Sequence, residues 1–222
     1  MNRCLELAAL GKLHTAPNPM VGCVIVYKDT IVAEGYHEKY GGAHAEVQAF
    51  ASLDESIDVY KCTVYVSLEP CSHFGKTPPC ADLIVAKKPK RVVIGMLDPH
   101  EKVAGKGIKK LLEAGINIHV GVLEEECKTL NKRFIKAHTR QLPYVTLKWA
   151  ETQDGYMAST TGQVKISDPN NDVFVHQLRA THQAILVGAA TVNTDNPMLD
   201  VRDSVGTNPV KVVYSPKLSV DR

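Results

Sequence analysis

The chain has 222 residues, 44% of them hydrophobic, and its 26 basic and 24 acidic residues give a net charge of +2. This composition indicates a globular protein of one or two domains and gives no sign of a nucleic-acid partner. No stretch approaches the roughly 20 apolar residues of a membrane-spanning helix, and the first residues lack the apolar core of a secretion signal. We therefore expect a cytoplasmic protein whose six cysteines are core thiols, metal ligands or catalytic groups.

Strand-like and helix-like segments alternate through the first 140 residues. Apolar spacing and turn residues predict helices over 2–13, 44–53, 78–88, 107–115 and 124–140, and strands over 21–29, 31–37, 63–70, 91–99 and 116–123. The first two strands are joined by a short polar turn, which is typical of a hairpin. An opening hairpin followed by alternating units predicts a three-layer α/β sandwich with a mixed sheet.

A second α/β pattern begins after a break near residues 140–143. It comprises the segment PYVTLKWAETQDG, a helix expected over 168–182, and strands expected over 184–190 and 210–215. We expect one domain over 1–141 and a second over 142–222. The second is expected to be incomplete, because roughly 80 residues are few for a sheet covered on both faces.

The stretch HAEVQAF places an imidazole, His44, and a carboxylate, Glu46, at the expected start of a helix. Residues two apart on a helix do not share a face, so these side chains cannot grip one atom from the same side. They can flank it instead. A metal held by His44 would leave Glu46 beside the open position of the metal.

The stretch EPCSHFGKTPPC supplies two further ligands, Cys71 at the end of a strand and Cys80 in the first turn of a helix. One His and two Cys form a three-ligand zinc set that leaves a fourth position for water, as catalytic sites do. Glu46 can then take a proton from this water and give it to a leaving amine, as in zinc nucleobase deaminases. In those enzymes two residues separate the cysteines, whereas eight separate them here.

Five segments of the chain resemble one family in that family's order: PNPMVGCVIV, GYHEKYGGAHAEV, SLEPCSHFGKTPPC, DPHEKVAGKG and PYVTLKWAETQDG. The family is the bifunctional riboflavin-biosynthesis deaminase/reductase. The resemblance implies a cytidine-deaminase-like sandwich followed by a dihydrofolate-reductase-like domain. It implies zinc-dependent deamination of 2,5-diamino-6-ribosylamino-4(3H)-pyrimidinone 5′-phosphate and then NADPH-dependent reduction of 5-amino-6-(5-phosphoribosylamino)uracil.

The resemblance also implies roles for individual residues. It assigns His44, Cys71 and Cys80 to zinc and Glu46 to proton transfer. It implies deaminase substrate contacts at Asn18, His37, Lys76 and Asp98, and in the reductase part it implies cofactor contacts at Ala150, Thr191 and Asp195, substrate contacts at Arg179, Leu199 and Arg202, and a catalytic candidate at Lys148.

The sequence departs from the family pattern in several places. His100 stands where the family has Asn, and the Trp before the segment matching GQVKISDP is missing. Val164 replaces a small polar substrate contact of the family, and no glycine-rich cofactor motif precedes Arg222. We therefore expect a C-terminally truncated chain that keeps the deaminase activity and has lost the NADPH-dependent reductase activity.

Two other functions stay open from the sequence. A cytidine deaminase or a tRNA-adenosine deaminase would share the zinc ligands and the glutamate. A non-catalytic zinc module would use the metal only to hold its fold. The partner expected here is a small pyrimidine ribosyl phosphate, with no nucleic acid and no membrane, and a homo-oligomer is left open. His73 is expected to be either a surface loop residue or a substrate contact, and no function is expected for His138.

Overall fold

The computed structural model describes residues 1–75, 78–100, 104–157, 159 and 164–217. The chain divides into two compact units, Met1–Val145 and Thr146–Arg222. Within the described residues, no helix is both long enough and apolar enough to cross a membrane.

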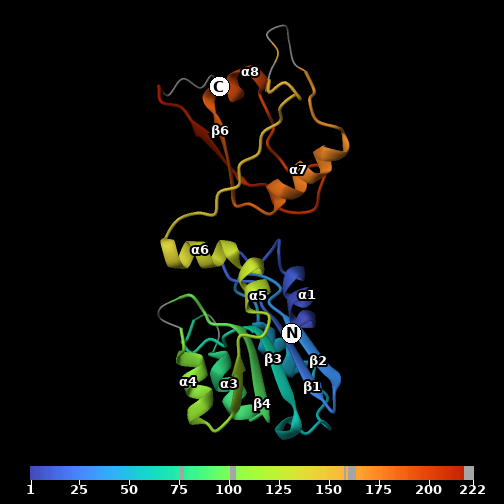
Figure 1. The fold of residues 1–222 in the computed structure, drawn as a ribbon, viewed down its shortest axis with the longest axis vertical. Coiled ribbons are helices and arrows are strands. Elements are labelled where there is room, and N and C mark those ends of the chain that lie inside the picture. The colour runs from blue at the N-terminus through green and yellow to red at the C-terminus, as the bar shows by residue number, and fades with distance from the viewer. Residues whose placement is uncertain (76–77, 101–103, 158, 160–163, 218–222) are drawn as a thin grey trace. The chain divides into compact units, whose positions relative to one another are not determined.

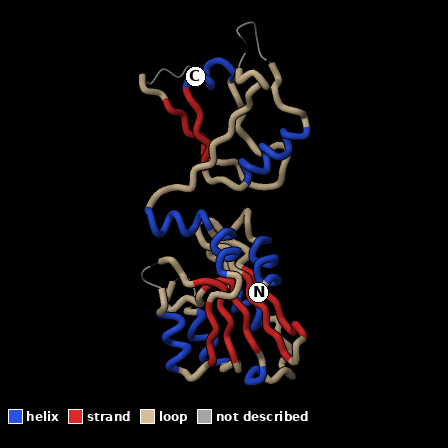
Figure 2. Tube along the Cα trace, in the orientation of Figure 1, coloured by secondary structure: helices blue, strands red, loops and turns tan. Residues whose placement is uncertain are grey.

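The first unit is built on one mixed five-stranded sheet (Figures 1 and 2). Its strands are β1 (Gly22–Tyr27), β2 (Thr30–Tyr36), β3 (Thr63–Leu68), β4 (Arg91–Met96) and β5 (Asn117–Val120), in the order β2-β1-β3-β4-β5. The first strand pairs antiparallel with β2 and β3, whereas β3, β4 and β5 run parallel. The carboxyl ends of β3 and β4 therefore meet at one edge, where loops can build a site.

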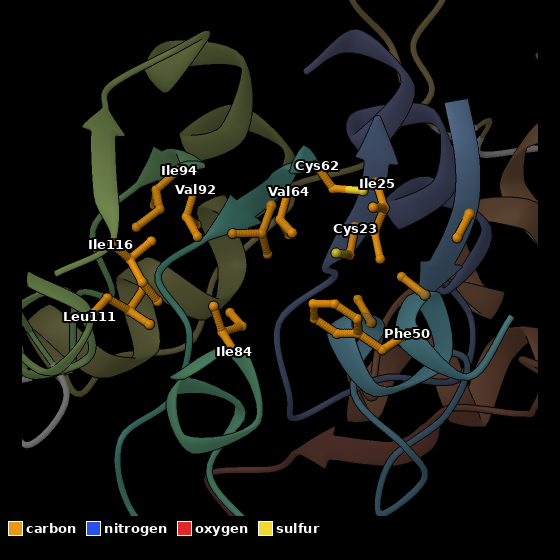
Figure 3. Packing of buried hydrophobic residues seen from close by; sticks show 14 residues of the cluster. Cys23, Ile25, Phe50, Cys62, Val64, Ile84, Val92, Ile94, Leu111 and Ile116 are labelled. Carbon is orange, nitrogen blue, oxygen red and sulfur yellow. The ribbon is translucent and has the colours of Figure 1, made fainter. Parts of the chain in front are cut away.

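Helices cover both faces of this sheet. One face packs against α2 (Ala45–Ala51), α3 (Cys80–Lys87) and α4 (Lys106–Glu113), and the other against α1 (Asn2–Leu10) and α5 (Glu124–Leu130). The larger core includes Ile25, Val64 and Ile94 from the strands with Phe50 and Ile84 from the helices (Figure 3). The three-layer α/β/α sandwich expected from the sequence is confirmed.

The expected helix over 124–140 is two helices in the structure, which is a correction. The first is α5, and α6 follows over Lys132–Arg140. The break falls at Asn131, which is 2% exposed. Its side chain accepts a hydrogen bond from the Met20 backbone N–H (2.8 Å) and donates one to the Met20 carbonyl (2.9 Å). This tie to a distant loop redirects the chain between the two helices.

The second unit contains a two-stranded parallel sheet of β6 (Ala184–Gly188) and β7 (Val210–Tyr214). Its helices are α7 (Asn170–Ala180) and α8 (Ala189–Asp195). The expected strand over 184–190 ends early, because Ala189 and Ala190 begin α8. Residues 143–150 form no strand. Leu186 in β6 is 66% exposed, so this strand is not buried as its apolar sequence suggested.

Candidate active site

His44 occupies the N-cap position of α2 with an extended backbone, φ −75° and ψ 161°. The helix lies directly on β2, because a Cβ added at Gly35 would stand 2.4 Å from the Ala49 nitrogen and 2.5 Å from the Ala45 oxygen. Glycine at this position allows the close approach that places the first turn of α2 at the sheet edge. The His44 Nδ1 atom lies 3.2 Å from the Cys80 Sγ and 3.5 Å from the Cys71 Sγ.

Cys71 and Cys80 are held together by the first turn of α3. Cys80 begins this helix after the N-cap residue Pro79, whose fixed φ suits a helix start. The Cys80 backbone N–H donates to the Cys71 Sγ at 3.3 Å, and the Ala81 N–H donates to the Cys71 carbonyl at 3.0 Å. Both sulfur atoms therefore face the His44 ring from one loop-to-helix junction.

The pKa values of the two thiols are shifted in opposite directions. Hydrogen bonding with the Cys80 thiol and with His44 lowers the pKa of Cys71 to about 4 despite its burial. The adjacent Cys71 and burial raise the pKa of Cys80. Hydrogen bonding to Cys71 raises the pKa of His44. Two thiolates this close repel each other unless a cation lies between them.

The three ligand atoms of His44, Cys71 and Cys80 all lie within 4.8 Å of one another and could hold a metal ion. One imidazole and two thiols form a donor set that suits zinc. Within the described part of the chain this group contains no fourth protein ligand. A tetrahedral ion held here would keep one position open for a small molecule.

Glu46 lies in the first turn of α2 and is 3% exposed. Burial, and then the negative charge of Cys71, raise the pKa of the Glu46 carboxyl. Its carboxyl lies within hydrogen-bonding reach of the Cys80 thiol. A carboxyl with a raised pKa beside an open metal position can accept and release protons closer to neutral pH than an exposed glutamate.

One cavity of about 430 Å³ is lined by His44, Glu46 and Cys71, and this volume is typical of sites for drug-sized ligands. Asn18 and His37 line it and contact each other, with 3.2 Å between the Asn18 Nδ2 and the His37 Nε2. The His37 Nδ1 lies 3.0 Å from the Ala43 carbonyl. Burial lowers the pKa of His37, so its neutral ring donates from Nδ1 and accepts at Nε2.

Asp98 follows the end of β4, lines the same cavity and is 8% exposed. It accepts a hydrogen bond of 2.8 Å from the His100 backbone N–H, and burial raises the pKa of its carboxyl. The structure thus brings Asn18, His37 and Asp98 to the cavity of the metal ligands. Lys76 lies outside the described residues.

The cavity is also lined by residues for which the sequence predicted no role, among them Glu69, Phe134 and His138. Phe134 and His138 lie one turn apart on α6, and their ring centroids are 4.2 Å apart. The His138 ring also lies 5.1 Å from the His100 ring. The i, i+4 spacing of an aromatic ring and an imidazole on one helix face is the sequence signal that could have indicated this wall.

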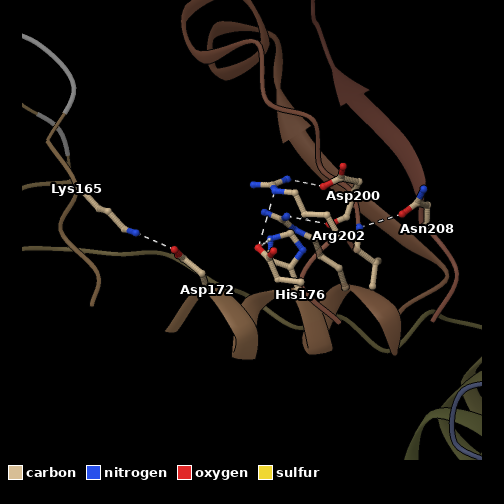
Figure 4. Close-up of polar contacts among 9 residues, drawn as sticks. Lys165, Asp172, His176, Asp200, Arg202 and Asn208 are labelled. Atoms are coloured by element: carbon tan, nitrogen blue, oxygen red, sulfur yellow. Dashed lines mark hydrogen bonds and ion pairs between the residues drawn. The ribbon is translucent and has the colours of Figure 1, made fainter. Parts of the chain in front are cut away.

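In the second unit, Arg179 and Arg202 both contact Asp200, and Figure 4 shows Arg202 beside Asp200. Arg179 donates to the Asp200 carbonyl at 3.0 Å, and Arg202 pairs with the Asp200 carboxylate. Burial lowers the pKa of Arg179. His176, 3% exposed, lies 3.1 Å from the Asp203 carboxylate in the same cluster.

The other residues expected at a reductase site are distributed over several segments. Leu199 is 8% exposed and adjoins Asp200. Thr191 and Asp195 lie four residues apart on α8. Lys148 and Ala150 lie in a segment without helix or strand, and Lys148 is exposed. These last four residues lie on other segments of the second unit than Arg179 and Arg202.

Two family models match the chain. The cytidine and deoxycytidylate deaminase zinc-binding region matches residues 1–96, and the RibD C-terminal domain matches residues 143–222. The fold and the site therefore define a protein of the zinc-binding deaminase class that continues into a reductase-type domain.

Comparison with individual relatives narrows this class to one family. The riboflavin biosynthesis protein RibD of Aquifex aeolicus is 46% identical over 99% of this chain and 62% of its own length, and that of Escherichia coli is 43% identical over 96% and 58%. A diaminohydroxyphosphoribosylaminopyrimidine deaminase/5-amino-6-(5-phosphoribosylamino)uracil reductase from Thermotoga maritima matches with a TM-score of 0.91 and 46% identity, over 98% of this chain and 62% of that one. RibD from Acinetobacter baumannii matches with a TM-score of 0.89 and 38% identity, over 98% and 63%.

The chain belongs to the RibD family of riboflavin biosynthesis proteins. It spans about three fifths of the length of these relatives. The family resemblance read from the sequence is thus confirmed.

Proposed function

We propose that this chain catalyses the zinc-dependent hydrolytic deamination of 2,5-diamino-6-ribosylamino-4(3H)-pyrimidinone 5′-phosphate in riboflavin biosynthesis. The observation that carries the proposal is the grouping of His44, Cys71 and Cys80 at a cavity that His44, Cys71 and the buried Glu46 line. The substrate is taken from the reaction named for the Thermotoga maritima relative. We place this reaction in the cytoplasm, where cysteines remain reduced.

Each residue of the metal group has a role in this proposal. His44, Cys71 and Cys80 hold the ion and leave one position for a small molecule. Bound zinc supplies Lewis acidity, which brings the pKa of water into the neutral range. Glu46 would take up a proton from the attacking water and deliver it to the departing amine. Because the Glu46 carboxyl is buried, this proton is not exchanged with bulk water during the transfer.

Substrate contacts are proposed for Asn18, His37, Lys76 and Asp98. The Asn18 amide and the neutral His37 ring offer donors and acceptors of the kind that orient a pyrimidine edge. Asp98 offers a carboxylate to hydroxyl or amino groups. We propose Lys76 as a phosphate contact because an ammonium group suits that charge.

We propose that residues 1–141 form the deaminase domain and residues 142–222 belong to a reductase domain, in line with the RibD C-terminal domain match at 143–222. In that domain NADPH is the proposed cofactor, held by Ala150, Thr191 and Asp195. The proposed reductase substrate contacts are Arg179, Leu199 and Arg202, and Lys148 is the proposed catalytic candidate.

The test is ammonia release from the diaminopyrimidine ribosyl phosphate by zinc-loaded protein. We compare the parent, Glu46→Gln, and Glu113→Gln, whose side chain is 66% exposed at the end of α4. The parent and Glu113→Gln should release ammonia, whereas Glu46→Gln should lose a factor of about 10² to 10⁴ in rate with its zinc content unchanged.

The alternatives give different results in the same assay. A cytidine or tRNA-adenosine deaminase would release ammonia from cytidine or from tRNA and not from the ribosyl phosphate. A non-catalytic zinc module would release none from any substrate, and zinc removal would then change only the stability of the fold. Either outcome would refute the proposed reaction.

A further inference from the structure

Glu69 is a buried carboxylate that the proposed chemistry does not use. It is 3% exposed, lies two residues before Cys71, and lines the cavity. In the described chain it forms no ion pair with a lysine or arginine. A buried charge of this kind is costly unless other groups stabilise it.

Four backbone N–H groups stabilise this carboxylate. Its Oε2 accepts from Asp98 (3.3 Å) and Gly105 (2.9 Å), and its Oε1 accepts from Gly107 (3.0 Å) and Ile108 (3.3 Å). Gly105 is the N-cap of α4 and has no side chain to cap the helix. Glu69 therefore acts as the cap of α4 from a distant strand end, and the positive end of the helix stabilises its charge.

The backbone after β3 and the first turn of α4 also lie in close contact. A Cβ added at Gly107 would stand 2.0 Å from the Pro70 carbonyl oxygen, so only glycine fits in this first turn of α4. The Glu69 backbone N–H also donates to the Met96 carbonyl at 3.0 Å, which joins the ends of β3 and β4. Glu69 and Pro70 thus tie together the strand end before Cys71, the strand end before Asp98, and α4.

We propose that Glu69 is a positioning residue: its carboxylate fixes Asp98 relative to the metal ligand Cys71, so that Asp98 contacts a substrate whose reacting carbon lies at the metal group. The inference deepens the proposed function and rests on it. The geometry requires two negative oxygens, since each accepts two N–H groups. An amide at the same position would turn its NH₂ group toward two N–H donors and leave that pair without an acceptor.

Hydrogen exchange tests the tie without substrate, first in the parent protein and then in two variants. The amides of Asp98, Gly105, Gly107 and Ile108 should exchange as slowly as those of the central strands β3 and β4. Glu69→Gln should speed exchange at Asp98 and Gly105 or at Gly107 and Ile108, and the control Glu113→Gln should change neither pair. Fast exchange at all four amides of the parent would overturn the proposal.

Substrate affinity tests the positioning role. Titration calorimetry with the diaminopyrimidine ribosyl phosphate is done in a Glu46→Gln background, so that the ligand is not consumed. Glu69→Gln should weaken binding about tenfold at unchanged zinc content, and much less when Asp98 is already alanine, because coupled residues act non-additively. Equal weakening in both backgrounds, or none, would refute positioning through Asp98.

The two measurements separate the two proposals. If the parent does not bind or deaminate the ribosyl phosphate, the proposed function fails, and the exchange data still decide whether Glu69 forms the tie. If the parent binds and Glu69→Gln binds equally well, the proposed function stands and the positioning role is wrong. Circular dichroism of each variant shows that it is folded, and where Glu69→Gln is not folded the exchange pattern of the parent decides.

Discussion

Cys71 differs from the other five cysteines in both exposure and acidity. It alone is partly exposed, whereas Cys4, Cys23, Cys62, Cys80 and Cys127 are buried. Its lowered pKa favours the ionised sulfur, and the thiolate is the form that alkylating reagents attack.

We predict that iodoacetamide modifies Cys71 first in metal-free protein at pH 7, and that added zinc protects it. Metal removal should thus convert an unreactive protein into one with a single fast-reacting thiol, as read by mass spectrometry of peptides. Cys23, buried in the core at 0% exposure, is the internal control and should react only on unfolding. Modification of Cys71 at the same rate with and without zinc would contradict the metal site.

Asp98 carries a cost in stability that depends on pH. Burial raises its pKa in the folded protein, so the folded state binds the proton more tightly than the unfolded chain. The resulting contribution to stability is fully present below the carboxyl pKa of the unfolded chain and is lost as the pH rises through the folded value. At neutral pH the ionised, buried group therefore lowers the free energy of unfolding.

We predict that Asp98→Asn raises the melting temperature at pH 7, by roughly 2–4 °C for each kcal/mol recovered, and that the gain disappears near pH 3. The Asn side-chain oxygen can still accept from the His100 N–H. Asp58→Asn is a control of opposite sign, because hydrogen bonding with Lys61 lowers the pKa of that exposed carboxyl. A gain for Asp98→Asn that persists at low pH would exclude this electrostatic origin.

At the scale of elements, the break between α5 and α6 fixes one wall of the cavity. Asn131 ties the break to Met20, next to the cavity-lining Pro19, and α6 then presents Phe134 and His138 to the same cavity. One buried amide therefore links a loop and a helix that are separated by 111 residues.

We predict that Asn131→Ala lowers the free energy of unfolding by about 2 kcal/mol, because both Met20 backbone groups lose their partner in a partly buried place. Urea denaturation at pH 7 measures the loss. Asn117→Ala is the matched control on the exposed start of β5 and should change stability by less than about 0.5 kcal/mol. Equal effects of the two substitutions would mean that the tie contributes nothing.

Local patterns in the sequence were sufficient for most of the first unit. Apolar alternation and proline or glycine punctuation predicted β3 and α3 within two residues at each end. The break at Asn131 was missed because the helical spacing continues through it, and only a contact with Met20 reveals it. In the second unit, α8 was missed because its alanines extend the apolar run of β6.

In the candidate site, too, local sequence patterns predicted some residues and missed others. His44, Glu46, Cys71 and Cys80 were predicted because short motifs show their chemistry and their positions at the ends of helices and strands. Glu69 was not, although it lies in the same motif, because its partners are 29 to 39 residues away and are backbone groups with no sequence signature. Residues that act through tertiary contacts can be identified only from the structure.

At the scale of the whole molecule, the cavity belongs to one unit alone. Its lining residues within the described part of the chain all fall between Pro17 and His138, inside the unit Met1–Val145. That unit also has its own buried core on both faces of a five-stranded sheet. A unit with its own core and a complete site can fold and function by itself.

We predict that a protein comprising residues 1–145 binds one zinc ion and deaminates the ribosyl phosphate with kcat/KM within about threefold of the full chain, since no lining residue is removed. Metal analysis and ammonia release measure the two properties, and the same fragment with Glu46→Gln is the inactive control. The fragment should unfold in one cooperative transition. A fragment that is folded and zinc-loaded but inactive would show that residues 146–222 contribute to the deaminase site, and the assignment of the reaction to the first unit would then be wrong.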